Sequence, residues 1–366
     1  MKTTFAKHDL ARALELTKPA IPSKPTQPIL AGVLITVSDD TATFDAFDQS
    51  SQVHTTIPCD TRETGRILLP HRTLHDVVAK LPDKPITITH MGSAAQFTCG
   101  SRTFELPPMT LDDYPPLPDM PPKVGTIDWS DLAAAIREVG AAAGRDDTLP
   151  MLTGIKVDAR DGALTLAATD RFRLAHTTLP WDGDDLDMLI PARDILTLAR
   201  TTWHGDVTIH HDQRRLGFTL GDTRTILRLI DADFPKWRPL IPKDSATTIR
   251  IDRKTMADAV KFTSVLAGDT GQVVLSITSG QVTIASKTAQ DGAGEEVIAC
   301  GTVGNELNIA FTSRYLLDAL AGDGTALMTF TQQGRPAMVW PDLPCDAGKV
   351  PDADRGHLLM PVRLPG

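Results

Sequence analysis

Hydrophobic positions along this chain follow two spacings that alternate in a regular order. Leu10, Ala13 and Leu14 recur at intervals of three and four residues, which predicts one buried face of a helix. The stretch "TATFDAF" (41–47) alternates apolar and polar residues, which predicts a half-buried strand. A second helical spacing begins at Leu74, and "PITITH" and "AQFTCGSRTFEL" (95–106) then favour two further strands.

The same order of parts returns twice more. The "PIL" of residues 28–30 comes back as the "PML" of residues 150–152, and three lengths of 122 residues make up the 366-residue chain. The first helical spacing returns at Leu132, Ala135, Ile136 and Val139 and, more weakly, at Met256, Val260 and Ser264. The second returns at Ile195, Leu198 and Ala199 and again at Leu316 and Leu320. "ALTLAAT" (163–169) repeats the strand pattern. This self-similarity predicts one structural unit copied three times.

Each repeat holds two helices and a set of mostly antiparallel strands, which makes it an α+β unit. We predict three similar domains that cover residues 1–122, 123–245 and 246–366. The phrases "DDYPPLP" (112–118) and "ADFPKWRPLIP" (232–242) share an acid, an aromatic residue and prolines, and they close the first and second domains. The five prolines of "YPPLPDMPP" (114–122) favour a stiff linker after the first domain.

Composition limits the class of protein. Apolar residues make up 41% and charged residues 23%, as in ordinary globular proteins. A net charge of −9 argues against a wholly basic nucleic-acid coat but permits a local basic face. Four widely spaced cysteines without a CxxC pair predict a reduced chain with buried thiols. We find no signal-peptide pattern and no long apolar run, so we expect a cytoplasmic protein without membrane contact.

Edge strands at both ends of each unit need partners, and closing the units into a ring gives every edge one. If the helices face inward at about 10 Å each, six of them leave a hole of roughly 9 Å, whereas twelve leave roughly 28 Å. Only the larger hole admits duplex DNA, whose two groove depths together reach about 16 Å. The repeat therefore favours a ring made by two copies of the chain.

Charge on the predicted helices agrees with such a ring. These segments hold twelve Lys or Arg residues and nine acids, whereas acids outnumber bases in the whole chain. The same pattern also fits ordinary solvated helix faces. The residues expected to face DNA, on the helices and in the loops after them, are Lys24, Arg72, Arg137, Arg145, Arg193 and Arg200. Contact through them would be independent of sequence and sensitive to salt.

Five phrases carry a resemblance to a known family. "KPTQPILAGVLI", "LPMLTGIKV", "AATDRFRLA", "FPKWRPLIP" and "LLMPVRLPG" occur in order along the whole chain. Together they resemble the bacterial DNA sliding clamp, the beta subunit of the replicative DNA polymerase III, in its actinobacterial style. The resemblance implies a non-catalytic processivity factor without cofactors, in which a head-to-tail homodimer forms a ring with inner helices and outer sheets around double-stranded DNA.

The resemblance also implies partners. They are a separate ATP-driven clamp loader, replicative and translesion DNA polymerases, and mismatch-repair and other proteins with a clamp-binding peptide motif. In the family, this peptide lies in a pocket between the second and third domains. On the matching positions here, the pocket is formed by Leu152, Thr169, Arg171, Phe172, Arg173, Leu174, Pro235, Leu240, Tyr315, Arg335, Met338, Leu358, Leu359, Met360 and Pro361. Apolar members would hold Leu or Phe anchors, and each also fits an ordinary core position.

This chain departs from the family at the pocket. Arg171 and Phe172 stand where the family commonly has Gly-His, and Pro239 stands where an arginine is frequent, so the preferred peptide stays open. Removal of Leu358–Gly366 is expected to abolish peptide binding and to leave the dimer intact. The family's dimer contact, carried onto this chain, pairs Phe104 and Leu106 with Val265 and Leu266, and a core position is the alternative for each.

Enzyme chemistry finds little support in the sequence. His71 and His75 have the helical spacing of two metal ligands, but no HExxH motif or third ligand accompanies them, so we predict no metal. We find no GxSxG, P-loop or GxGxxG motif and expect no catalytic residue. Asp170 is best explained as a turn-stabilising acid. Two alternatives to a housekeeping clamp stay open: a specialised second copy, such as a drug-insensitive or self-resistance paralogue, and a clamp-fold protein without a replication role.

Overall fold

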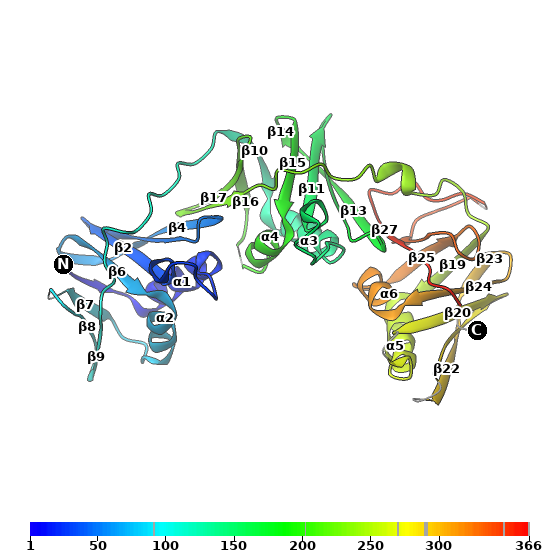
Figure 1. The fold of residues 1–366 in the computed structure, drawn as a ribbon, viewed down its shortest axis with the longest axis horizontal. Helices are drawn as coiled ribbons and strands as arrows, with labels where there is room; N and C mark the ends of the chain where they lie inside the picture. The colour runs from blue at the N-terminus through cyan, green and yellow to red at the C-terminus, as the bar shows by residue number, and fades with distance from the viewer. Residues whose placement is uncertain (91, 202, 269–270, 289–291, 347, 365–366) are drawn as a thin grey trace. The chain divides into compact units, whose positions relative to one another are not determined.

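The computed structural model describes residues 1–90, 92–201, 203–268, 271–288, 292–346 and 348–364 (Figure 1). Six α-helices occur in these ranges, two in each repeat. They are α1 (Lys7–Thr17), α2 (His71–Lys80), α3 (Trp129–Gly140), α4 (Ala192–Leu198), α5 (Arg253–Ser264) and α6 (Ser313–Ala319). Short 3-10 turns are η1 (Lys18–Ala20), η2 (Pro28–Ala31), η3 (Pro150–Leu152) and η4 (Arg238–Leu240).

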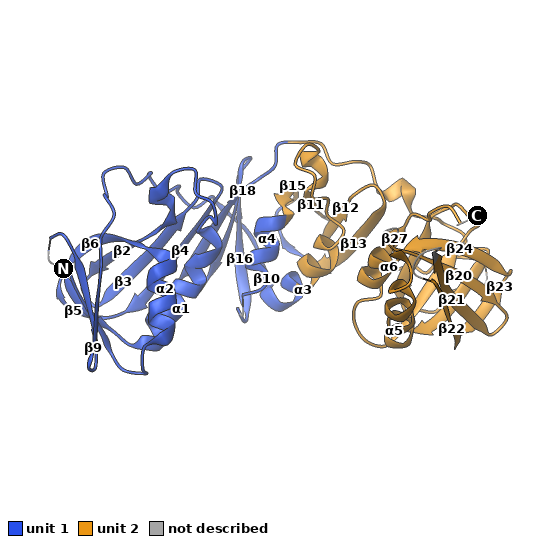
Figure 2. Ribbon diagram, turned by 60° about the horizontal axis from the view of Figure 1, so that its bottom comes forward, with its two compact units in different colours: residues 1–133, 181–184, 193–231 blue, residues 134–180, 185–192, 232–366 orange. Residues whose placement is uncertain are grey.

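The strands form four antiparallel sheets, and the chain divides into two compact units (Figure 2). Unit 1 comprises residues 1–133, 181–184 and 193–231, and unit 2 comprises residues 134–180, 185–192 and 232–366. In unit 1 a five-stranded sheet has the order β5 (Asp60–Glu63), β1 (Lys2–Phe5), β7 (Ile86–His90), β8 (Ala95–Cys99), β9 (Arg102–Leu106). Its nine-stranded sheet has the order β14 (Asp182–Gly183), β10 (Lys123–Asp128), β16 (Asp206–His211), β17 (Arg215–Leu220), β18 (Thr223–Arg228), β4 (Ser51–Pro58), β3 (Thr41–Phe47), β2 (Gly32–Ser38), β6 (Gly65–Pro70).

Unit 2 has the same plan. Its nine-stranded sheet has the order β15 (Leu186–Pro191), β11 (Gly154–Arg160), β12 (Ala163–Thr169), β13 (Arg173–Pro180), β27 (Arg355–Leu359), β26 (Ala337–Pro341), β25 (Thr325–Phe330), β19 (Thr247–Asp252), β23 (Gly301–Gly304). A four-stranded sheet has the order β22 (Gly292–Ala299), β21 (Gln281–Thr288), β20 (Gln272–Thr278), β24 (Leu307–Thr312). The predicted α+β class and the two helices of each repeat are confirmed.

Strand pairing joins one repeat to the next inside each nine-stranded sheet. β18 of the second repeat pairs with β4 of the first, and β13 of the second pairs with β27 of the third. The division into units therefore runs through the middle repeat. A repeat boundary in the sequence is not an edge of a sheet in the structure.

The predicted helix faces lie in the cores. Leu10, Leu14 and Leu74 are fully buried in one cluster with the sheets of the first repeat. Met256 and Val260 are fully buried in the cluster of the third repeat. On α5 the next buried position is Thr263 rather than Ser264, and the buried Thr263 hydroxyl is satisfied because it donates to Ala259 O at 2.9 Å inside the helix.

Three local expectations need correction. The stretch 95–106 forms two strands, not one, because Gly100 adopts a positive φ of 60° and reverses the chain. The linker 114–122 has no regular structure but packs against β16 and β17, where Arg215 donates to Asp119 O at 2.8 Å. Of the four free thiols only Cys99 is fully buried. Among the described residues, we find no helix with the length and apolar content needed to span a membrane.

Candidate functional site

A tight turn between β12 and β13 is the centre of the site in unit 2. Asp170 Oδ1 accepts hydrogen bonds from the backbone N–H groups of Phe172 and Arg173, both at 3.0 Å. Arg171, between Asp170 and Phe172, has a positive φ of 79°, a conformation that residues other than glycine rarely adopt. Asp170 thus stabilises the turn, and the turn presents Arg171 and Phe172 to solvent.

Arg173 ties this turn to α6. Its side chain is 6% exposed, and Nε lies 3.0 Å from Asp170 Oδ2 while Nη1 lies 2.5 Å from Asp318 Oδ2. The guanidinium carbon lies 4.5 Å from the centroid of the Tyr315 ring, a cation–π contact. Arg173 is therefore a buried cation with two carboxylates and an aromatic face, and it fixes the position of Tyr315.

A pocket of about 300 Å³, which we call the turn pocket, opens beside these residues. It is lined by Ala143, Gly144, Arg145, Asp146, Leu149, Leu152, Asp170, Arg171, Phe172, Arg173, Arg314 and Tyr315. Five of the residues expected at a peptide pocket meet here: Leu152, Arg171, Phe172, Arg173 and Tyr315. The Phe172 and Tyr315 rings stack at 6.5 Å. Arg145, which was expected to face DNA, lines the turn pocket. Arg314 also lines the turn pocket and was not among the residues expected there, although its neighbour Tyr315 was.

Several expected pocket residues form a buried floor instead. Leu174, Met338 and Leu358 are at most 3% exposed and belong to a cluster that includes Trp237 and Trp340. Leu359 is equally buried, in the core of the third repeat. The buried Thr169 hydroxyl donates to Arg173 O at 2.6 Å. These residues support the site from beneath.

Three large apolar side chains from distant parts of unit 2 are exposed. Phe172 is 54% exposed, Leu240 is 55% exposed and Met360 is 39% exposed. The Met360 N–H donates to Phe172 O at 2.9 Å, so the tail runs beside the turn. Pro361, next in the tail, is half-buried, whereas Arg335 is exposed in the turn between β25 and β26. Exposed apolar groups next to a pocket suit a ligand with apolar anchors.

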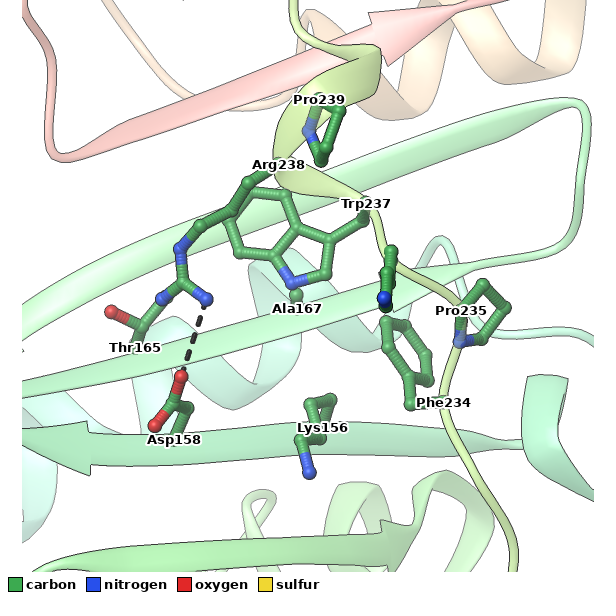
Figure 3. Close-up of a pocket in the computed structure, with 10 residues that line it drawn as sticks. Lys156, Asp158, Thr165, Ala167, Phe234, Pro235, Trp237, Arg238 and Pro239 are labelled. Atoms are coloured by element: carbon green, nitrogen blue, oxygen red, sulfur yellow. Dashed lines mark hydrogen bonds and ion pairs between the residues drawn. The ribbon is translucent and has the colours of Figure 1, made fainter.

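Residues 232–242, which we call the strap, cross the helix-free face of β11 and β12 (Figure 3). Trp237 is buried and stacks on His176 at 5.2 Å, and Arg238 pairs with Asp158 at 3.2 Å. A second pocket, of about 250 Å³, lies under the strap, and Pro235 lines it. Trp237 thus anchors the middle of the strap, and Leu240, near its C-terminal end, stays exposed.

The residues expected to contact DNA are partly brought together in unit 1. Lys24, Arg193 and Arg200 line one cleft of about 1240 Å³, together with Arg12 and Lys18. Asp194 also lines it, and burial together with Asp48 raises the pKa of this carboxyl. Arg72 on α2 and Arg137 on α3 are exposed but do not line this cleft.

The residues expected at a dimer contact lie beside two sheet edges. Leu106 is buried and Phe104 stacks on Phe97 at 4.5 Å, both on the edge strand β9. Val265, which follows α5, is 77% exposed. Leu266 packs over Gly294 of the edge strand β22, because a Cβ at Gly294 would lie 2.6 Å from Leu266 Cδ1.

The histidines considered as metal ligands have structural partners. His71 is buried, its Nε2 pairs with Leu14 O at 2.8 Å, and burial lowers its pKa to about 4. His75 stacks on His71 and pairs with Glu15 at 2.8 Å. These contacts hold α2 against α1. In the described part of the chain, no three His, Cys, Asp or Glu side chains gather as a metal site would need.

Comparison with known proteins covers the whole chain. Residues 1–118, 126–236 and 238–345 match the models of the N-terminal, central and C-terminal domains of the DNA polymerase III beta subunit. The beta sliding clamp of Streptomyces coelicolor is 31% identical, and the beta sliding clamp homolog GriR of Streptomyces muensis is 29% identical, each over 100% of both chains. The crystal structure of the Bacillus subtilis DNA polymerase sliding clamp matches with a TM-score of 0.91 at 27% identity and covers 100% of both chains.

Proposed function

Because the chain belongs to the family of the DNA polymerase III beta subunit, the bacterial sliding clamp, we propose how it performs that role. As a clamp it is a non-catalytic processivity factor of DNA replication. We propose that two copies close into a ring around duplex DNA and hold partner proteins by a peptide at the turn pocket. The domains are residues 1–122, 123–245 and 246–366, and the partners are a loader, polymerases and repair proteins.

One observation carries the peptide site in this proposal. Exposed Phe172 lines a pocket whose shape is fixed by the buried Arg173 and by the Asp170 turn, the exposed Met360 is hydrogen-bonded to Phe172 through its backbone, and the strap adds the exposed Leu240. A preformed apolar site loses little conformational entropy on binding, which suits a short linear ligand. Arg145, Arg171 and Arg314 on the pocket wall add a preference for acidic groups in the peptide.

Retention on DNA of different topology tests the ring. After loading by a clamp loader from the same source, the protein is expected to stay on nicked circular DNA at high salt and to leave linear DNA. A closed ring is held by topology, whereas contacts to phosphates weaken as salt rises. Equal loss from circular and linear DNA would contradict the proposal.

Alanine at Phe172 or at Met360 is expected to weaken peptide binding about tenfold, because each removes an exposed apolar contact at the site. The measurement is fluorescence anisotropy with a fluorescein-labelled peptide that carries a Leu-Phe pair. Val303→Ala is the matched control, since Val303 is 57% exposed on β23 and does not line the turn pocket. Unchanged affinity in both test variants would refute the assigned pocket.

A dimer contact is supported by an apolar patch beside the edge strand β22. Phe262, Val265 and Val297 are each more than half exposed, on or beside α5 and β22, which pack together. We propose that β9 of one copy meets this patch on the other, with Phe104 and Leu106 against Val265 and Leu266. Two unpaired edges of antiparallel sheets offer each other complementary backbone hydrogen bonds.

Val265→Asp is therefore expected to convert the dimer largely to monomer, because it places a charge in an apolar contact. Sedimentation velocity measures the change. The control is Val303→Asp, which adds the same charge at another exposed valine of unit 2. A variant at Val265 that sediments like the unmodified dimer would exclude this contact.

A specialised copy of the clamp is the second candidate. The observation in its favour is the 29% identity, over both full chains, to a protein described as a homolog of the beta sliding clamp. Product length on a primed single-stranded circle, with loader and polymerase from the same source, tests whether the chain serves replication. A copy that serves replication supports long products, and a clamp-fold protein without that role does not.

A further inference from the structure

The turn between β3 and β4, in the first repeat, has the same backbone geometry as the turn between β12 and β13 that lines the turn pocket. Asp48 Oδ1 accepts from the N–H of Ser50 at 2.9 Å and from the N–H of Ser51 at 2.6 Å. Gln49 has a positive φ of 76°, as the second residue of the Asp170 turn does. The β3–β4 turn is therefore built like the β12–β13 turn.

The strand register beside the two turns also matches. β4 and β18 place Gln52 opposite Ile226, and β13 and β27 place Leu174 opposite Leu358. In each case the first residue lies four positions after the acid that forms the turn. Gln52 and Ile226 thus stand where the site of unit 2 has its apolar floor.

The residue two positions further along the second strand completes the match. Arg228 N–H donates to Ser50 O at 2.8 Å, and Met360 N–H donates to Phe172 O at 2.9 Å. Ser50 and Arg228 therefore replace the two exposed apolar residues Phe172 and Met360. The backbone is copied, and the chemistry of the side chains is changed from apolar to polar and cationic.

A groove of about 800 Å³ lies at this place, which we call the unit 1 groove. Phe47, Gln52, Ile226, Pro118, Arg214 and Arg228 are among its lining residues. Val53, which follows Gln52, packs with Ala20 of η1. Because side chains alternate along a strand, Gln52 points to the opposite, helix-free face of the sheet.

Two features of the unit 1 groove lack partners. Gln52 is 7% exposed, and its Oε1 is buried without a hydrogen-bond partner. Arg214 and Arg228 are exposed, and no carboxylate of the described residues forms an ion pair with either of them. Arg215, by contrast, pairs with Asp212 at 2.7 Å. The groove thus offers one buried acceptor and two available cations beside a strip of apolar wall.

We propose that the unit 1 groove is a second docking site, whose ligand is an extended acidic peptide segment of a partner protein. Carboxylates of the peptide pair with Arg214 and Arg228, which suits the bidentate geometry of guanidinium groups. A backbone N–H of the peptide donates to Gln52 Oε1, and an apolar side chain lies on Phe47 and Ile226. The phosphates of a nucleic acid also pair with arginines, but a phosphate backbone has no N–H group to donate to Gln52 Oε1.

The test uses the full chain and the fluorescein-labelled peptide GEDLDEG-amide, followed by fluorescence anisotropy at low salt. Saturable binding is expected, and Arg228→Glu is expected to weaken it at least about tenfold. Arg224→Glu is the matched control, because Arg224 is exposed on the same strand and the same face but does not line the groove. The control is expected to stay within about twofold of the unmodified chain.

Gln52→Leu tests the buried acceptor separately. It places leucine where Leu174 stands in unit 2, so the fold is expected to persist while peptide affinity falls about fivefold. The proposal is overturned if the neutral peptide GQNLNQG-amide binds equally well, or if Arg224→Glu weakens binding as much as Arg228→Glu. It is also overturned if labelled oligothymidylate binds more tightly than the acidic peptide and loses affinity in Arg228→Glu. None of these outcomes bears on ring closure or on the turn pocket of unit 2.

Discussion

Replacing Arg173 with methionine is expected to lower the free energy of unfolding by about 4 kcal/mol, because it leaves two carboxylates without their shared cation. The Arg173 side chain is 6% exposed, and the side chain of its partner Asp170 is 15% exposed. The second partner, Asp318, lies on α6, so the loss also releases the helix that carries Tyr315. Peptide binding is expected to fall with stability, since the turn and Tyr315 both line the turn pocket.

Urea unfolding of Arg173→Met measures the loss. Arg171→Met is the matched control, because Arg171 is exposed in the same turn and is expected to cost less than about 0.5 kcal/mol. A double-mutant cycle with Asp318→Asn isolates the ion pair from the packing of the arginine stem. Equal unfolding free energies for the Arg171 and Arg173 variants would show that the buried pair does not support the site.

A chain that ends at His357 is expected to lose the folded state of unit 2, whereas a chain that ends at Met360 is expected to keep it. β27 lies between β13 and β26, so it is a central strand of the nine-stranded sheet. Leu358 and Leu359 are at most 3% exposed and fill two different clusters. Removing a buried leucine costs about 2–5 kcal/mol, and two such losses approach the whole stability of a typical domain.

Circular dichroism during heating compares the two truncated chains. The chain that ends at Met360 loses the bridge between Ala310 and Val362, and its midpoint is expected to fall by only a few degrees. The sequence led us to expect that removal of Leu358–Gly366 abolishes peptide binding and leaves the dimer intact, whereas the burial of Leu358 and Leu359 predicts that their loss also unfolds unit 2. Similar melting of both truncated chains would contradict a central role for β27.

Local patterns were sufficient to predict the elements of the fold. "TATFDAF" and "ALTLAAT" form β3 and β12 with the predicted bounds, because period-two alternation depends only on neighbouring residues. The hairpin at Gly100 escaped prediction, since one glycine inside an apolar–polar pattern does not distinguish a reversal from a continuous strand. The pairing of β4 with β18 and of β13 with β27 joins residues far apart in the chain, and no local spacing reports it.

The sequence did not show which residues of the site are buried and which are exposed. Leu174, Leu358 and Met360 look alike in the sequence, yet the first two are buried and the third is exposed. The difference comes from the strap, whose Trp237 belongs to the cluster that buries Leu174 and Leu358. The ion pair of Arg173 with Asp318 spans 145 positions and was equally invisible. The turn is recognisable from local sequence, whereas non-local packing decides which of its neighbours a ligand can reach.

The strand pairing between repeats has a consequence for the preparation of fragments. A polypeptide cut at the end of the first repeat would keep β4 but lose β18, and β4 would become a bare edge of eight residues. Ser51, Val53 and Thr55, buried in the intact chain, would lie on that strand. Long unprotected edges recruit other chains, so such a fragment is prone to aggregate. Fragments that follow the compact units, rather than the repeats, keep each strand beside its neighbour.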